Sequence, residues 1–264
     1  IKPGGPDIAP AQVLAGGGAD VMVDWMPSAL AAREKGLPLV NIAQPFKSSG
    51  MMLTCRKDMG VNSTDDLKGK TLGVWFYGNE YPFLSWMSRL GLATDGSANG
   101  VTVLKQGWGV EPLTEGQAAC VSTMSYNEYW VVRDAGYTPE QLTVFKYQAE
   151  GASTLEDGLY VLEKNLGDDS FKDKMVRFVR ASMKGWKYAE ANPKEAASII
   201  LDNDDAGVQT EKHQIRMMGE IAKLTAGSNG SLDPSDYQRT VKVLMSGSSD
   251  PVITKEPSGA WTHD

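Results

Sequence analysis

The chain has 264 residues, 33 acidic side chains against 26 basic ones, and a formal net charge of −7 at pH 7. This length accommodates one large domain or two modest lobes. The acidic balance argues against a nucleic-acid partner, and no apolar run approaches the roughly 18 residues that a membrane-spanning helix needs.

Short apolar strands alternate with helices from Ile1 to about Gly167. The expected strands are 20–23, 38–42, 51–55, 71–75, 101–106, 118–124, 142–146 and 158–162. The expected helices between them are 9–15, 28–35, 81–92, 109–115 and 127–135. This alternation predicts an α/β fold with largely parallel sheets.

From Asp168 to Met245 the pattern becomes almost entirely helical. The expected helices are 170–191, 194–201, 210–224 and 234–245. At the ends of helices, Ser63 is placed to cap a short helix, and Asp233 to cap the last one with Pro234 at its first position.

An α/β half followed by a helical segment fits two lobes between which the chain crosses, near 51–56 and near 147–157. The lobes would then be discontinuous in sequence. Lobe 1 would comprise residues 1–54 with 158–264, and lobe 2 would comprise residues 55–157. Ligands of open parallel sheets bind beyond the carboxyl ends of the strands, so we expect those ends to face a cleft between the lobes.

Aromatic and polar side chains gather at the turns that follow four expected strands. They are Asp24 and Trp25; Trp75, Tyr77, Gly78, Asn79 and Glu80; Trp108; and Tyr126, Asn127 and Glu128. A ring stacked on a ligand ring contributes about 0.5–1.5 kcal/mol beyond area burial. Amides and carboxylates can fix the polar edge of a ligand, and helix N-termini add free N–H donors. The combination suits a neutral or weakly cationic aromatic heterocycle better than a small inorganic anion, since these turns hold no Lys or Arg.

The same residues also have structural explanations. The tryptophans at the turns could belong to the core, and the two glutamates could be carboxylates that the helix dipole favours. Asp24 could be a helix N-cap. Trp86 and Trp186 lie within expected helices and are expected to serve packing.

Catalysis and metal binding have little support in the sequence. There is no GxSxG, Walker or GxGxxG motif and no CxxC, and the only histidines are His213 and His263. The two glutamates of the turns could form an acid/base pair only if the fold brings them together. Cys55 and Cys120 are expected to be buried free thiols, although they could pair if the fold places them side by side. We therefore expect a binding protein with no cofactor and no metal rather than an enzyme.

Three segments resemble a known family. Residues 65–75 (DDLKGKTLGVW) resemble the DLKGKxxGV segment of periplasmic substrate-binding proteins of ABC transporters, in the nitrate/sulfonate/taurine superfamily. Residues 14–22 (LAGGGADVM) resemble the helix-to-strand passage of the same proteins. Residues 118–128 (AACVSTMSYNE) resemble a segment of the thiamine-pyrimidine-precursor branch. The resemblance covers roughly residues 1–162.

The resemblance implies a two-lobed, type II periplasmic-binding-protein fold that closes on its ligand and delivers it to a membrane permease. The family's usual first strand and helix would precede Ile1 and are expected to be missing from this chain. The implied ligand is a thiamine pyrimidine precursor, with riboflavin or a small sulfonate as alternatives. A pyrimidine-synthesising enzyme is the alternative of another class, but its eukaryotic relatives carry a cysteine-rich motif that is absent here. The implied protein is a monomer, either periplasmic or extracellular and lipid-anchored.

Overall fold

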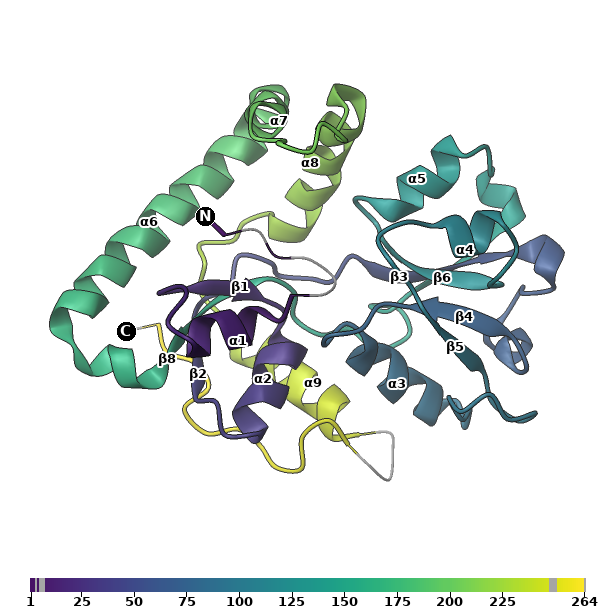
Figure 1. Cartoon of the computed structure of the whole chain (residues 1–264), viewed down its shortest axis with the longest axis horizontal. Coiled ribbons are helices and arrows are strands. Elements are labelled where there is room, and N and C mark those ends of the chain that lie inside the picture. Colours follow the sequence, from purple (N-terminus) through teal and green to yellow (C-terminus); the bar gives the residue numbers. More distant parts are fainter. Residues whose placement is uncertain (3, 5–7, 247–250, 264) are drawn as a thin grey trace.

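The computed structural model describes residues 1, 2, 4, 8–246 and 251–263 (Figure 1). The strands are β1 (Met22–Asp24), β2 (Leu39–Ala43), β3 (Met51–Arg56), β4 (Thr71–Val74), β5 (Thr102–Lys105), β6 (Cys120–Met124), β7 (Leu142–Lys146) and β8 (Gly158–Leu162). The helices are α1 (Pro10–Ala15), α2 (Met26–Glu34), α3 (Glu80–Arg89), α4 (Glu111–Thr114), α5 (Glu128–Asp134), α6 (Asp169–Ala191), α7 (Pro193–Asp202), α8 (Glu211–Thr225) and α9 (Pro234–Met245). Each expected strand and helix is therefore present, which confirms the α/β assignment.

The strands form two sheets that lie side by side along the molecule (Figure 1). One has the order β1-β8-β2 and the other the order β5-β4-β6-β3-β7. Helices α1, α2 and α9 lie around the smaller sheet, while α3, α4 and α5 accompany the larger one (Figure 1). The long helix α6 and the α7–α8 pair extend beyond the smaller sheet (Figure 1).

The expectation of largely parallel sheets is wrong. Strand β4 is parallel to β5 and β6, but β3 is antiparallel to both β6 and β7. In the smaller sheet, β8 is antiparallel to both of its neighbours. The reason is that α2 carries the chain from β1 to β2 in one direction, and β8 then returns from the other sheet and inserts between them. Helical crossovers set the direction of consecutive strands, but not that of a strand added later.

The first crossing between the sheets lies before β3 rather than within it. Every residue of Met51–Arg56 pairs inside the larger sheet, from Met51 opposite Met124 to Arg56 opposite Leu142. The expected crossing at 51–56 is therefore displaced to the segment 44–50. The reason is that the buried run of β3 serves as an inner strand between β6 and β7. The second crossing connects β7 to β8 through residues 147–157.

Cys55 and Cys120 form a disulfide that joins β3 to β6. The expectation of free thiols is wrong. The two residues lie directly opposite each other in the antiparallel register, with Cα atoms 3.9 Å apart. Both are fully buried. Strand pairing brings together two residues that are 65 positions apart, and neither cysteine's local sequence contains that information.

Two helix caps and the packing of one tryptophan agree with the expectations from the sequence. Ser63 forms a capping box with Asp66, and the Asp233 carboxylate accepts a hydrogen bond from the backbone N–H of Ser235, as expected. Trp86 is buried in the core of the larger sheet, where its ring centroid lies 5.3 Å from that of Tyr147. The packing role expected for this tryptophan is therefore confirmed.

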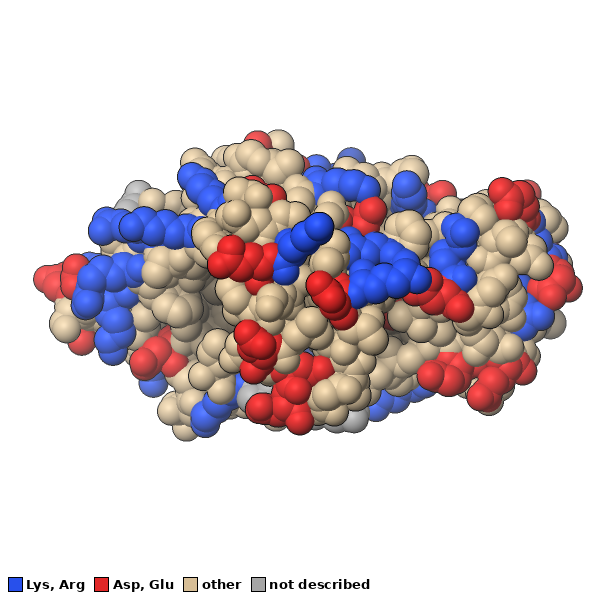
Figure 2. Space-filling model, turned by 90° about the horizontal axis from the view of Figure 1, so that it is seen from above, with Lys and Arg blue, Asp and Glu red and all other residues tan. Residues whose placement is uncertain are grey.

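The charged side chains are mixed in sign over the face that carries α5, α7 and α8. Figure 2 shows this face from above, with acidic and basic side chains interspersed. Among the described residues, no helix is both long and apolar enough to cross a lipid bilayer.

Candidate functional site

Asp24 ends β1 and carries the first of the predicted turns. Its Oδ1 accepts a hydrogen bond from the backbone N–H of Trp25 at 2.8 Å, and its Oδ2 accepts one from the Ser28 hydroxyl at 2.8 Å. Burial raises the pKa of Asp24 to about 6. The carboxyl is thus held at the start of α2 in a poorly solvated position, where a ligand can compete for it.

The turn after β4 is pressed against α2 at Gly78. A Cβ atom on Gly78 would lie 2.5 Å from the Cβ of Ser28, and the backbone has a φ of 109° that favours glycine. The N–H of Gly78 donates to Glu80 Oε2 at 2.7 Å, and burial raises the pKa of Glu80. Burial, and then the charges of Glu80 and Asp24, raise the pKa of Tyr81. The first two predicted turns therefore meet.

A carboxyl pair that the sequence analysis did not select lies in the second crossing. Glu156 is fully buried, and its Oε1 accepts hydrogen bonds from the Ser49 hydroxyl at 2.7 Å and the Gly50 N–H at 2.5 Å. Its Oε2 has no hydrogen-bond partner among the described residues. Burial raises the pKa of Glu156 to about 8. For Asp157, burial and then the charge of Asp24 raise the pKa to about 6.

Gln44 fixes the backbone beneath this pair. Its Nε2 donates to the carbonyl oxygens of Glu156 at 2.9 Å and of Asp157 at 3.3 Å. Its Oε1 accepts from Asn41 at 3.1 Å. One side chain of the first crossing therefore holds the backbone of the second, so that the carboxyls lie where the two connections meet.

The third predicted turn, after β6, reaches the same carboxyls. Burial, and then the charges of Glu156, Asp157 and Glu128, raise the pKa of Tyr126 well above its ordinary value. Glu128 is buried; its Oε2 accepts from the Met124 N–H at 2.9 Å and its Oε1 from Asn127 Nδ2 at 2.7 Å. Burial raises the pKa of Glu128 as well. Phenol and carboxyl groups from both sheets thus meet at one place.

The predicted aromatic residues divide into an inner and an outer group. Trp25, Trp75 and Tyr126 are partly buried and pack against the core of the larger sheet. Trp75 also donates from Nε1 to the Gly107 carbonyl at 2.9 Å. By contrast, Tyr77 and Trp108 are 48% and 73% exposed. The rings of the inner group therefore lie against the core, and those of the outer group lie at the surface.

The outer residues of the turn after β4 make mainly local contacts. The Lys105 ammonium lies 5.2 Å from the centroid of the Tyr77 ring. Asn79 Nδ2 donates to the Phe76 carbonyl at 3.2 Å. Tyr77 has a φ of 64°, which is uncommon for a residue other than glycine. These contacts define the rim of the turn rather than its interior.

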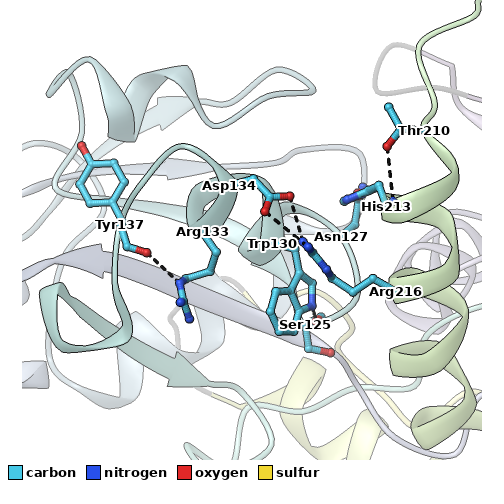
Figure 3. Close-up of polar contacts among 9 residues, drawn as sticks. All are labelled: Ser125, Asn127, Trp130, Arg133, Asp134, Tyr137, Thr210, His213 and Arg216. Carbon is cyan, nitrogen blue, oxygen red and sulfur yellow. Dashed lines mark hydrogen bonds and ion pairs between the residues drawn. The ribbon is translucent and has the colours of Figure 1, made fainter.

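Two pairs of residues were not selected by the sequence analysis. Glu156 and Asp157 had one available signal: an adjacent acidic pair inside an expected crossing, in the segment 153–158 (STLEDG). His213 and Arg216 had none, because α8 meets the turn after β6 only in the folded chain (Figure 3). In the part of the chain that the structure describes, no group of three or more His, Cys, Asp and Glu side chains is placed to hold a metal ion.

The chemistry of the site follows from these groups. Partly buried rings offer flat faces for stacking. Carboxyls with raised pKa values can donate or accept a proton in a hydrogen bond near neutral pH. The site therefore combines ring faces with carboxyls that can both donate and accept hydrogen bonds.

Comparison with curated proteins finds relatives along most of the chain. A formylaminopyrimidine-binding protein of Halalkalibacterium halodurans is 23% identical over 242 residues, which covers 89% of this chain and 71% of the relative. A protein of Haemophilus influenzae named for thiamine biosynthesis is 25% identical over 253 residues, covering 93% of this chain and 75% of the relative.

Solved structures show the same fold at low sequence identity. A Bordetella bronchiseptica protein matches with a TM-score of 0.70 and 18% identity, covering 99% of this chain and 82% of that one. The periplasmic aliphatic sulphonate-binding protein of Escherichia coli matches with a TM-score of 0.69 and 11% identity, covering 92% of this chain and 73% of that one. The chain thus has the periplasmic-binding-protein fold. The profile of the family described as NMT1/THI5 like matches residues 1–196, and the chain belongs to this NMT1/THI5-like family.

Proposed function

We propose that this protein is the solute-binding component of an ABC importer and captures an aminopyrimidine precursor of thiamine. The fold, the family and the name of the formylaminopyrimidine-binding relative support this proposal. In this proposal the lobes are residues 1–54 with 158–264 and residues 55–157, with β3 assigned to the second lobe because it pairs there. The partner is a membrane permease, and the protein acts as a monomer outside the cytoplasmic membrane.

The observation that carries the proposed ligand class is the carboxyl cluster formed by Asp24, Glu156 and Asp157. A carboxyl group matches the adjacent amino group and ring nitrogen of an aminopyrimidine, since it can accept from one and, when protonated, donate to the other. Glu156 Oε2 is buried and without a hydrogen-bond partner among the described residues, so it is suited to such a bond. A sulfonate would instead face like charges.

The predicted site residues take complementary parts in this proposal. Trp25, Trp75 and Tyr126 stack on the ring, with Tyr77 and Trp108 at the rim. The polar edges are fixed by Asp24, Asn79, Glu80, Asn127 and Glu128, and Gly78 allows the close approach of α2. Closure of the lobes follows from tighter binding of the ligand to the closed state, with no chemical step.

The test is a thermal-shift panel with formylaminopyrimidine, hydroxymethylpyrimidine, riboflavin, taurine and nitrate. A ligand at 100 times its Kd adds about 2.7 kcal/mol to the unfolding free energy, which raises Tm by roughly 5–10 °C for a chain of this size. We expect a shift with a pyrimidine, and its loss in Asp24→Asn. Asp169→Asn is the matched control, because that side chain is 98% exposed. A shift with taurine or nitrate alone would refute the proposed ligand class.

A second measurement separates binding from catalysis. After incubation, the bound pyrimidine is released by denaturation and identified by mass spectrometry. A binding protein returns the ligand unchanged, and a pyrimidine-synthesising enzyme would convert or produce it. Recovery of a converted pyrimidine would replace the importer proposal with the enzyme alternative.

A further inference from the structure

Helix α8 follows β8 of the smaller sheet in the chain, yet it contacts the turn after β6 of the larger sheet (Figure 3). His213 Nε2 lies 2.7 Å from Asn127 Oδ1. Arg216 donates to both carboxylate oxygens of Asp134, at 2.9 and 3.4 Å. The Arg216 guanidinium also lies 4.7 Å from the centroid of the Trp130 ring. Two side chains one helical turn apart therefore reach across to the same short segment.

The His213 contact continues to a buried carboxylate. Asn127 Nδ2 donates to Glu128 Oε1 at 2.7 Å, so its Oδ1 is the acceptor and His213 Nε2 is the donor. Burial and the charge of Arg216 lower the pKa of His213, which favours the neutral imidazole with its proton on Nε2. A chain of hydrogen bonds thus runs from α8 through the amide to Glu128, at the start of α5.

The Arg216 contacts hold helix α5, which follows the same turn. Its guanidinium lies between the Asp134 carboxylate and the Trp130 ring, and Trp130 Nε1 donates to the Ser125 carbonyl at 3.0 Å. The bidentate geometry of an arginine and a carboxylate fixes the orientation of both groups. The turn between β6 and α5 is therefore tied to α8 through Asn127, and helix α5 is tied to it through Trp130 and Asp134.

We propose that His213 and Arg216 are positioning residues that latch α8 onto the turn after β6 and onto helix α5 when the lobes close, and so set how long the ligand stays bound. This inference rests on the proposed function, because closure matters only if the site between the lobes binds a ligand. Neither residue needs to touch the ligand. Because the contacts join the two lobes, opening breaks them, so they stabilise the closed state alone.

The decisive experiment is a charge swap across the latch. Arg216→Asp places two carboxylates against each other and removes the ring contact, whereas Arg216→Asp with Asp134→Arg restores an ion pair. From the usual strengths of exposed ion pairs and cation–π contacts, we expect the single variant to release a bound pyrimidine about fivefold faster. The double variant should recover part of this loss, and the association rate should change little.

The control separates a latch from a general loss of stability. Arg177→Asp breaks an exposed ion pair that lies within α6 and does not connect the two lobes. It should leave the dissociation rate unchanged, and the ligand-free Tm of Arg216→Asp should fall no further than that of this control. Equal dissociation rates in wild type and Arg216→Asp would overturn the latch. It would also be overturned if the double variant released the pyrimidine as fast as Arg216→Asp.

Failure of the latch and failure of the proposed function give different results. If wild type binds no pyrimidine, the proposed function fails. Small-angle X-ray scattering of the ligand-free proteins then decides on the latch. A larger radius of gyration in Arg216→Asp than in wild type and Arg177→Asp supports it, and identical curves overturn it.

Discussion

Glu156 should make the protein less stable as the pH rises, which is unusual for a carboxyl group. Burial raises its pKa from 4.5 to about 8, with the negative charge of Asp157 acting in the same direction. In the unfolded chain the carboxyl ionises near its ordinary value. Between the two values the folded state holds one proton that the unfolded state has lost. The stabilisation is therefore complete below pH 4.5 and is lost as pH rises toward 8.

The size of the effect follows from the two pKa values. Linkage over the interval from pH 6 to pH 8 gives a fall in unfolding free energy of about 2 kcal/mol from Glu156 alone. Asp24 and Asp157 have pKa values raised to about 6, so their contributions to the unfolding free energy change mostly below this interval. Glu156→Gln keeps an oxygen that can accept from Ser49 and Gly50 but has no proton to lose. The variant should therefore lack this part of the pH dependence.

Urea unfolding followed by circular dichroism at pH 6, 7 and 8, without ligand or reductant, measures the difference. Equal m values in both proteins would show that the midpoints report stability. Glu163→Gln is the matched control, because its side chain is 54% exposed. If wild type and Glu156→Gln lose stability in parallel between pH 6 and 8, the buried carboxyl is not held in its protonated form, and the reasoning is refuted.

Three further predictions concern other features of the fold. Reducing the Cys55–Cys120 disulfide, which closes a loop of 65 residues, should lower the unfolding free energy by about 4 kcal/mol, measured by urea unfolding with and without dithiothreitol. Gly78→Ala should lower it by about 1–3 kcal/mol, because the added Cβ meets Ser28 at 2.5 Å and the φ of 109° disfavours alanine; calorimetry gives the change. Trp108→Ala should change it by less than about 0.5 kcal/mol, since the ring is 73% exposed; a shift beyond that would mean that the ring packs in solution.

Local pattern was sufficient to predict the elements but not their pairing. Each strand is a short apolar run between turn signals, so its presence follows from a few neighbouring residues. The direction of a strand depends on the path of the whole chain. The run 158–162 is recognisable as a strand, yet nothing in it indicates that it inserts antiparallel between β1 and β2. The disulfide escaped for the same reason, since the register that brings Cys55 opposite Cys120 is a property of β3 and β6 together.

The candidate site shows the same division, with a consequence for where a ligand should be sought. Asp24, Glu80 and Glu128 were selected because they follow strands, and the structure brings their turns close to one another. Glu156 and Asp157 were not selected, since they lie in a connection and do not directly follow an expected strand. In this crossing, residues 152–156 are buried, and the Glu156 carboxyl loses water without gaining a cation among the described residues. The buried carboxyl without a hydrogen-bond partner on Oε2 therefore lies at the crossing. We expect a ligand with N–H donors to gain more binding free energy there than at the exposed Trp108 ring.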